Sequence, residues 1–193
     1  MKSLVAALRP TTFIESEKLS HFLDAEITLV SETFQHTGSF KFRAAYNLAA
    51  SVENDEILTA SSGNFGQALA FACRLTKKKC TVVMPETSAR VKIDAVREYG
   101  ATVDLVDTRK IGRSERVAQL AAEMPGAYFA SAYDDPFVIE GNATLGDEIA
   151  GYKNDFDLVI APVGGGGLTS GIVNGFNRSG KSGEIFGAEP LLG

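Results

Sequence analysis

Short apolar runs rich in β-branched residues alternate along the chain with longer segments of helical pattern. The runs that we predict to be strands cover residues 27–31, 57–60, 80–84, 102–106, 128–131, 157–163 and 184–188. The segments that we predict to be helices cover residues 42–51, 66–75, 89–99, 114–124, 145–152 and 168–177. A regular alternation of strands and helices is typical of βαβ units, so we expect an α/β fold with parallel sheets and helices on both faces.

Composition narrows the function classes. Of the 193 residues, 45% are hydrophobic and 22% are charged, which predicts a packed core. The net charge of −5 and the scattered basic residues argue against a nucleic-acid partner. No apolar run has transmembrane length and the N-terminus has no secretory signal, so we expect no membrane partner and a cytoplasmic location. Cys73 and Cys80 are too few for a disulfide framework and are expected to be buried free thiols.

Lys41 is the first candidate for chemistry. It lies between Phe40 and Phe42 in the segment 37–43, Thr-Gly-Ser-Phe-Lys-Phe-Arg. Apolar neighbours desolvate an ammonium group and lower its pKa, which leaves a nucleophilic amine suited to Schiff-base chemistry. Because most lysines are solvated surface groups, a surface position remains the alternative on this segment alone.

A run of four glycines, residues 164–167, lies between the predicted buried strand 157–163 and the helix that opens with Leu168. Glycines let several backbone N–H groups point into one concavity, and a helix N-terminus adds partial positive charge. The segment therefore predicts a phosphate-binding loop, with a merely flexible loop as the alternative. The dinucleotide fingerprint does not fit, because its third glycine would fall on Thr169 or Ser170.

Residues 61–67, Ser-Ser-Gly-Asn-Phe-Gly-Gln, form a second strand-to-helix junction. Free N–H groups and serine hydroxyls suit a carboxylate there, and Asn64 can donate to a ring hydroxyl or phenolate. A plain helix cap explains the same residues equally well.

Two other patterns are weaker indications of function. Residues 175–182 match the P-loop letter for letter, but a predicted helix precedes them and a strand follows, so we interpret them as a helix end and turn. His21 and His36 are the two histidines of the chain, so a catalytic triad or a metal site built on histidines is not favoured.

Taken in this order, the segments resemble the β-family, or fold type II, of pyridoxal-phosphate enzymes, and within it the threonine/serine dehydratase and serine racemase group. The matching segments are 37–43, 61–67, 84–101, 164–168 and 188–190. The resemblance implies two open parallel-sheet domains of the tryptophan synthase β-like type. Residues 1–40 and 132–193 would form a large cofactor domain, incomplete at the C-terminus, and residues 41–131 a small domain.

The resemblance also implies the site residues. Lys41 would anchor pyridoxal 5′-phosphate through a Schiff base and act as the catalytic base, and Asn64 would bond the pyridine 3′-oxygen. Phe40 would pack beside the cofactor, whose phosphate would be held by the backbone N–H groups of Gly164, Gly165, Gly166, Gly167 and Leu168. The carboxylate of a small amino-acid substrate would be surrounded by Ser61, Ser62, Gly63 and Gln67, with Ser62 as a second catalytic acid or base.

The activity that the resemblance implies is β-elimination of L-threonine, L-serine or a related β-hydroxy amino acid to a keto acid and ammonia, in a homodimer. The alternatives are an amino-acid racemase, a β-replacement enzyme, or a truncated and incompetent chain, because relatives continue past Glu189. Phe65 stands where the group usually carries histidine, which leaves the substrate open. In the racemase-like branch the Glu189 position is a ligand of a divalent cation, but its partner ligands would lie beyond Gly193.

Overall fold

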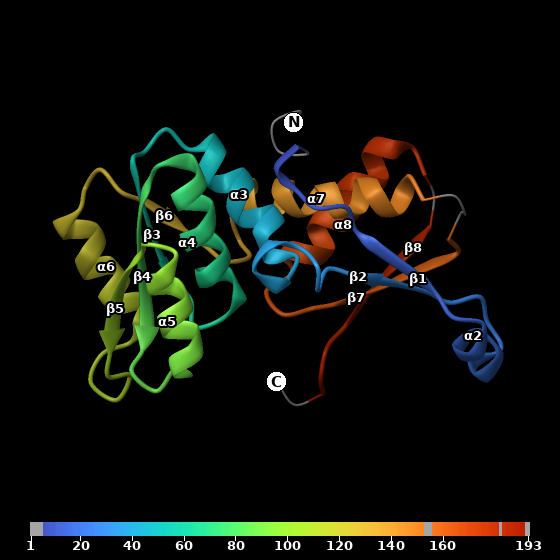
Figure 1. The fold of residues 1–193 in the computed structure, drawn as a ribbon, viewed down its shortest axis with the longest axis horizontal. Helices are drawn as coiled ribbons and strands as arrows, with labels where there is room; N and C mark the ends of the chain where they lie inside the picture. Colours follow the sequence, from blue (N-terminus) through green and yellow to red (C-terminus); the bar gives the residue numbers. More distant parts are fainter. Residues whose placement is uncertain (1–5, 153–155, 182, 192–193) are drawn as a thin grey trace.

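The computed structural model describes residues 6–152, 156–181 and 183–191 and shows helices packed on separate small sheets (Figure 1). The strands are β1 (Thr12–Glu15), β2 (Thr28–Ser31), β3 (Glu56–Ala60), β4 (Lys79–Pro85), β5 (Thr102–Val106), β6 (Tyr128–Ala130), β7 (Leu158–Pro162) and β8 (Glu184–Ala188). The helices are α2 (Glu17–Leu23), the 3-10 turn η1 (His36–Gly38), α3 (Lys41–Ser51), α4 (Asn64–Thr76), α5 (Arg90–Glu98), α6 (Arg113–Glu123), α7 (Pro136–Ala150) and α8 (Gly167–Ser179).

The four-stranded sheet has the order β5-β4-β3-β6, with all neighbours parallel. Successive residues of a strand point to opposite faces, so Ile57 packs into one apolar cluster with residues of α3 and α4, and Leu58 packs into another with residues of α6. Helices cover both faces of this sheet, which explains its almost continuous apolar strands and confirms the prediction for this region (Figure 1).

The parallel pair β7-β8 differs, because α7 and α8 cover one face. These two helices pack closely: a Cβ at Gly146 would lie 2.5 Å from the carbonyl oxygen of Ile172, and a Cβ at Gly175 would lie 2.5 Å from that of Ala143. On β7 the side chain of Ala161 is 3% exposed, whereas Ile160 is 66% exposed. The prediction of a fully buried strand over 157–163 is therefore wrong for the outward face.

Several local predictions also need correction. The strand β1 and the helix α2 were not predicted, and β1 pairs with β2 in an antiparallel ladder rather than a parallel one. α2 is short and buries none of its residues, so it has no apolar stripe that a periodicity argument could find. α7 begins at Pro136, well before the predicted 145, because Asp135 caps it and Pro136 occupies its first turn, although Gly141 and Asn142 are weak helix formers.

Other predictions are confirmed. Cys73 on α4 and Cys80 on β4 are buried free thiols. Residues 175–180 form the end of α8 and its left-handed cap at Gly180, not a strand-to-helix loop. Within the described ranges, no helix is both long and apolar enough to cross a membrane.

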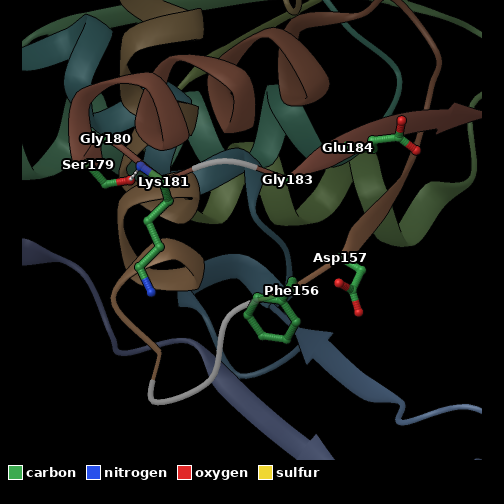
Figure 2. Close-up of a pocket in the computed structure, with 7 residues that line it drawn as sticks. All are labelled: Phe156, Asp157, Ser179, Gly180, Lys181, Gly183 and Glu184. Atoms are coloured by element: carbon green, nitrogen blue, oxygen red, sulfur yellow. Dashed lines mark hydrogen bonds between the residues drawn. The ribbon is translucent and has the colours of Figure 1, made fainter.

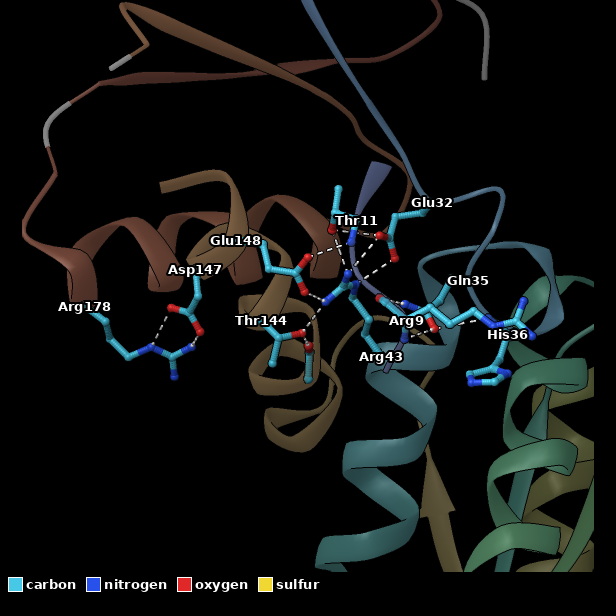
Figure 3. Close-up of polar contacts among 11 residues, drawn as sticks. Arg9, Thr11, Glu32, Gln35, His36, Arg43, Thr144, Asp147, Glu148 and Arg178 are labelled. Atoms are coloured by element: carbon cyan, nitrogen blue, oxygen red, sulfur yellow. Dashed lines mark hydrogen bonds and ion pairs between the residues drawn. The ribbon is translucent and has the colours of Figure 1, made fainter. Parts of the chain in front are cut away.

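The structure has two regions, the first built on the sheet β5-β4-β3-β6 and the second on the pair β7-β8. Helix α3 joins them, since it packs against both α4 of the first region and α7 of the second (Figure 1). Phe40, just before it, packs with the α7/α8 cluster, and Phe42 packs with the α3/α4 cluster. The fully buried Arg43 adds polar contacts to Thr11, to Glu32 after β2 and to Glu148 on α7 (Figure 3). Lys41 therefore lies where the two regions meet, while the division of the chain into 1–40 plus 132–193 and 41–131 stays a prediction.

Candidate active site

Lys41 is the first residue of α3, and its amine is half-buried. Nζ donates a hydrogen bond to the carbonyl oxygen of Ala132 at 2.8 Å, and burial lowers the pKa of Lys41 from its usual value. Nζ lies 5.1 Å from the ring centroid of Phe40 and 5.7 Å from that of Phe65. Both rings help to exclude water from the amine, as the sequence argument requires.

Phe42 is not one of these rings, so the expected pair of flanking aromatics is partly wrong. Its ring centroid lies 4.8 Å from that of His36 and 5.5 Å from that of Phe71. The physical reason is helical geometry: residues next to each other in a helix point about 100° apart. Phe65, the residue that replaces the usual histidine, supplies the second ring instead.

The turn before Lys41 carries strain and unsatisfied polar groups. Thr37 has φ 60°, in the left-handed region that β-branched residues rarely adopt. The hydroxyls of Thr37 and Ser39 are buried, and neither has a hydrogen-bond partner in the part of the chain that the structure describes. Such features gather at ligand sites, where a bound group satisfies the polar atoms.

The glycine loop follows β7 as predicted. Gly166 has φ 82° and precedes α8, so the loop turns sharply into a helix N-terminus. A Cβ at Gly165 would lie 2.1 Å from Cγ of Tyr133, so only glycine permits Tyr133 to pack there. Leu168 turns its side chain into the α7/α8 cluster, and Thr169 in the first turn has a buried hydroxyl without a partner among the described residues.

The serine loop lies at the carboxyl end of β3. Oγ of Ser61 accepts hydrogen bonds from the N–H groups of Gly66 at 3.0 Å and Gly63 at 3.4 Å, so this side chain has the helix-capping role that the sequence left open. Ser61, Ser62 and Gly63 line a cavity of about 330 Å³ together with residues 131–133. Asn64 and Gln67 lie on the first turns of α4, where Asn64 is exposed and Gln67 is half-buried.

Residues 131–135, after β6, connect these parts and were missed as a site element. Ala132 accepts the bond from Lys41 and lines the cavity, and Tyr133 packs on the glycine loop. The buried Asn142 donates from Nδ2 to the carbonyl oxygen of Gly167 at 3.1 Å, which holds the same loop from α7. The sequence signal that indicates these residues is their position directly after a predicted strand. Residues that follow a parallel strand lie at the sheet edge where α/β proteins bind ligands.

Two other predicted or suspected features are a metal ligand at Glu189 and the segment that matches the P-loop pattern. Glu189 is exposed, and no three His, Cys, Asp or Glu side chains group as metal ligands within residues 6–152, 156–181 and 183–191; a metal at Glu189 stays a prediction. The segment that matches the P-loop pattern borders a cavity of about 830 Å³ with Phe156, Asp157 and Glu184 (Figure 2). This cavity lies at the amino ends of β7 and β8, opposite the glycine loop.

A desolvated amine, linked through Ala132 and Tyr133 to a glycine loop at a helix N-terminus, is an arrangement suited to a phosphorylated ligand that carries an aldehyde. Residues 5–193 match the family model described as pyridoxal-phosphate dependent enzyme. The chain belongs to that family.

Named relatives agree with this assignment. The chain is 36% identical to threonine dehydratase 2 of Solanum lycopersicum, over 91% of this chain and 30% of that protein. It is 33% identical to the β-hydroxyaspartate dehydratase of Paracoccus denitrificans, over 95% and 59% of the two chains. The crystal structure of serine racemase from Dictyostelium discoideum superposes with a TM-score of 0.88 at 32% identity, over 98% and 63%, which confirms the fold class.

The chain spans 30% to 60% of the length of the curated relatives it matches. The residues present fit pyridoxal phosphate. A desolvated amine, a loop that only glycine can form beside Tyr133, and buried hydroxyls without partners at Ser39 and Thr169 are the groups that an aldehyde and a phosphate would engage.

Proposed function

We propose that this chain carries the active site of a pyridoxal-phosphate dependent enzyme for β-elimination of L-threonine, L-serine or a related β-hydroxy amino acid. The products are a keto acid and ammonia. The names of relatives support this reaction class, since a threonine dehydratase and a β-hydroxyaspartate dehydratase both match most of the chain.

One observation carries the proposal. The Lys41 amine is desolvated and bonded to Ala132, in the same short loop whose next residue, Tyr133, packs on the glycine loop. The serine loop lines a cavity with both loop residues. The amine, the glycine loop and the serine loop are therefore linked through Ala132 and Tyr133, which supports one shared site.

Each part has a role that follows from its chemistry. Pyridoxal phosphate, when bound at Lys41, supplies an electron sink for charge developing at the substrate Cα. The lowered pKa of Lys41 favours its free amine, which can both hold the cofactor and take the Cα proton as a general base. Asn64 is proposed to donate to the ring oxygen, and Phe40 covers the amine from one side.

The remaining predicted residues bind charged groups. The backbone N–H groups of residues 164–168 lie at the start of α8 and are proposed to hold the phosphate. The serine loop, with Gln67 one turn into α4, is proposed to receive the substrate carboxylate. The cap formed by Ser61 fixes this loop in place, which reduces the ordering that substrate binding requires.

Racemisation is the second candidate. Ser62 lines the same cavity as Ala132, the partner of Lys41, so a second proton-transfer group is available there. The similarity to a serine racemase of Dictyostelium discoideum supports this alternative.

A homodimer and a cytoplasmic location complete the proposal and rest on the resemblance to the dehydratase and racemase group. Sedimentation equilibrium of the purified protein tests the first, and a fluorescent fusion in the source cells tests the second. One named relative is chloroplastic, so a plastid signal is the result that would contradict the location.

The activity is tested by incubating the protein and pyridoxal phosphate with L-threonine or L-serine, and by measuring keto acid and ammonia in equal amounts. Chiral chromatography of the remaining amino acid detects racemisation. Lys41→Ala should abolish both reactions, because it removes the amine on which they depend. Keto-acid release at an unchanged rate in that variant would contradict the proposal.

A further inference from the structure

Two cysteine side chains meet in a crevice of the first region. Cys73 lies near the end of α4 and Cys80 near the amino end of β4, whereas the serine loop follows the carboxyl end of the neighbouring parallel strand β3. Both cysteines are buried, both line a crevice of about 170 Å³, and a hydrogen bond joins their thiols. They are the two cysteines of the chain, so any thiol chemistry belongs to this pair.

The environment of the pair favours metal binding over oxidation. The hydrogen bond to Cys73 raises the pKa of Cys80 well above its usual value, and burial and the nearby carboxylate of Glu56 act in the same direction. Because oxidants attack the thiolate form, a thiol that keeps its proton at neutral pH reacts slowly with them. A soft metal ion, by contrast, displaces the protons of the thiols that bind it.

The number of ligands restricts the choice of metal. Glu98 also lines the crevice, but no three His, Cys, Asp or Glu side chains group as metal ligands within residues 6–152, 156–181 and 183–191. A structural zinc site needs four protein ligands, so two sulfur atoms alone do not suit Zn²⁺. Soft thiolates select Cu⁺, which is satisfied by two of them.

The charges around the crevice suit such a complex. One Cu⁺ held by two thiolates carries a net negative charge. The lining of the crevice contains two cations, Arg74 and Lys78, and one carboxylate, Glu98. The guanidinium of Arg74 is held there, because it lies 4.8 Å from the ring centroid of Phe71 and 5.3 Å from that of Tyr99. The excess of positive charge in the lining is complementary to the complex.

We propose that Cys73 and Cys80 form a two-thiolate binding site for a soft monovalent metal ion, Cu⁺. Binding replaces two S–H bonds with two S–Cu bonds, both protons pass to the solvent, and the copper keeps its oxidation state. The inference does not rest on the proposed function, because neither thiol is among the groups assigned to pyridoxal phosphate or to the substrate.

The test is an anaerobic competition for Cu⁺ between the protein and a chromophoric Cu⁺ chelator. It compares the wild type with Cys73→Ala and Cys80→Ala, each of which keeps a single thiol. Ala101→Ser is the matched control, because Ala101 is buried, lines the same crevice and leaves both thiols in place when it is changed. Lys41→Ala shows whether the ion binds independently of the candidate active site.

We expect the wild type and Lys41→Ala to bind one Cu⁺ per chain with equal affinity. Each cysteine variant should bind at least about 100-fold more weakly, because one of the two ligands is lost. Ala101→Ser should stay within about threefold of the wild type, since both ligands remain. The affinity of the wild type should rise by up to about 100-fold per pH unit in the acidic range, because two protons leave for each ion bound.

Several results would overturn the inference. Either cysteine variant could bind Cu⁺ as tightly as the wild type, or the wild type could bind Zn²⁺ as tightly as Cu⁺. Loss of Cu⁺ binding in Lys41→Ala would assign the ion to the candidate active site instead. X-ray absorption at the copper edge of the wild type needs no variant, so it decides the question even if a cysteine variant does not fold. Two sulfur ligands are expected, and nitrogen or oxygen ligands in their place would contradict the site.

Discussion

The sheet β5-β4-β3-β6 and the pair β7-β8 are both parallel and rich in apolar residues, yet they are buried to different extents. Ile57 in β3 is 0% exposed, whereas Ile160 in β7 is 66% exposed. The difference comes from the helices: α4 and α6 cover opposite faces of the first sheet, and α7 and α8 cover one face of the second. An apolar strand sequence thus shows that both faces of a strand are able to pack against other elements. A face is buried only where a helix covers it.

The candidate site draws on both regions and lies between them. The first region supplies the serine loop and Ala132, and the second supplies the glycine loop. Lys41 sits on α3, the helix that contacts both. Since each region alone holds only part of the proposed site, the contacts that join the regions should matter more for the site than contacts within either one.

The largest expected effect is at the buried cluster of Arg43. This guanidinium bonds both carboxylate oxygens of Glu32 at 2.7 Å and 2.9 Å, and Glu148 at 2.8 Å. Arg43→Met would leave two buried or half-buried carboxylates unpaired, and we expect it to lower the unfolding free energy by about 3–5 kcal/mol, measured by urea denaturation.

Arg178 is the control for that variant, because it also bridges two carboxylates but its side chain is 34% exposed. It pairs with Asp147 (Figure 3) and with Glu140. Arg178→Met should cost at most about 1 kcal/mol. Equal losses of unfolding free energy for Arg43→Met and Arg178→Met would contradict the view that the buried Arg43 cluster stabilises the protein more than the exposed Arg178 pairs.

The second prediction uses the two matched isoleucines. Ile57→Ala removes packed methyl groups from the fully buried β3 and should cost about 2–5 kcal/mol of unfolding free energy. Ile160→Ala removes the same groups from the outward face of β7 and should change the unfolding free energy by less than about 0.5 kcal/mol. Urea denaturation of both variants measures the difference, and a large loss at Ile160 would show that its face is covered in solution.

The third prediction tests the glycine loop with neighbouring glycines. A Cβ at Gly165 would collide with Tyr133, whereas a Cβ at Gly164 would meet no atom within 4 Å. Overpacking of this kind costs about 1–3 kcal/mol, so Gly165→Ala should weaken pyridoxal-phosphate binding about 5- to 100-fold, as measured by absorbance titration. Gly164→Ala should stay within about threefold of the wild type. Equal affinities for the two variants would argue against Tyr133 as the support of the loop.

The smallest expected effect concerns acid stability. Burial by itself raises the pKa of Glu148, but hydrogen bonds from Arg43 and from the N–H group of Thr11 outweigh it and leave the pKa below its usual value. A carboxyl whose folded-state pKa is lowered stabilises the protein above its unfolded pKa, and this contribution is lost as the pH falls through the folded value.

Glu148→Gln should therefore cost about 1 kcal/mol of unfolding free energy at neutral pH, and the difference from the wild type should shrink below about pH 4.5. Urea denaturation across pH 3–7 measures it. The exposed Glu53→Gln serves as control, and a difference for Glu148→Gln that grows towards acid pH would contradict the assigned cause.

The sequence predicts the first region better than the second. The core of 57–60 and 80–84 appears in the structure with shifts of one residue, because strands buried on both faces are continuous apolar runs. The edge strand 102–106 has the predicted bounds. β1 and α2 were missed because they bury little, and the early start of α7 was missed because Gly141 and Asn142 are poor helix formers.

Within the site, local motifs pointed to Lys41 and to the serine and glycine loops, since each lies at a strand-to-helix junction or a distinctive turn. Residues 131–133 and Asn142 join them only through long-range packing, which no local pattern contains. The rings beside the Lys41 amine illustrate the same limit: Phe40 is adjacent in sequence, but Phe65 arrives from another helix.

The most direct test of the central claim is to map where pyridoxal phosphate attaches. The protein is incubated with an equimolar amount of pyridoxal phosphate near neutral pH, reduced with borohydride, digested and examined by mass spectrometry. Because burial lowers the pKa of Lys41, more of its amine is unprotonated at that pH than for a solvated lysine, so the label should lie on the peptide containing Lys41 and be absent there in Lys41→Ala. Label spread over surface lysines such as Lys77 and Lys79, with no preference for Lys41, would contradict the account.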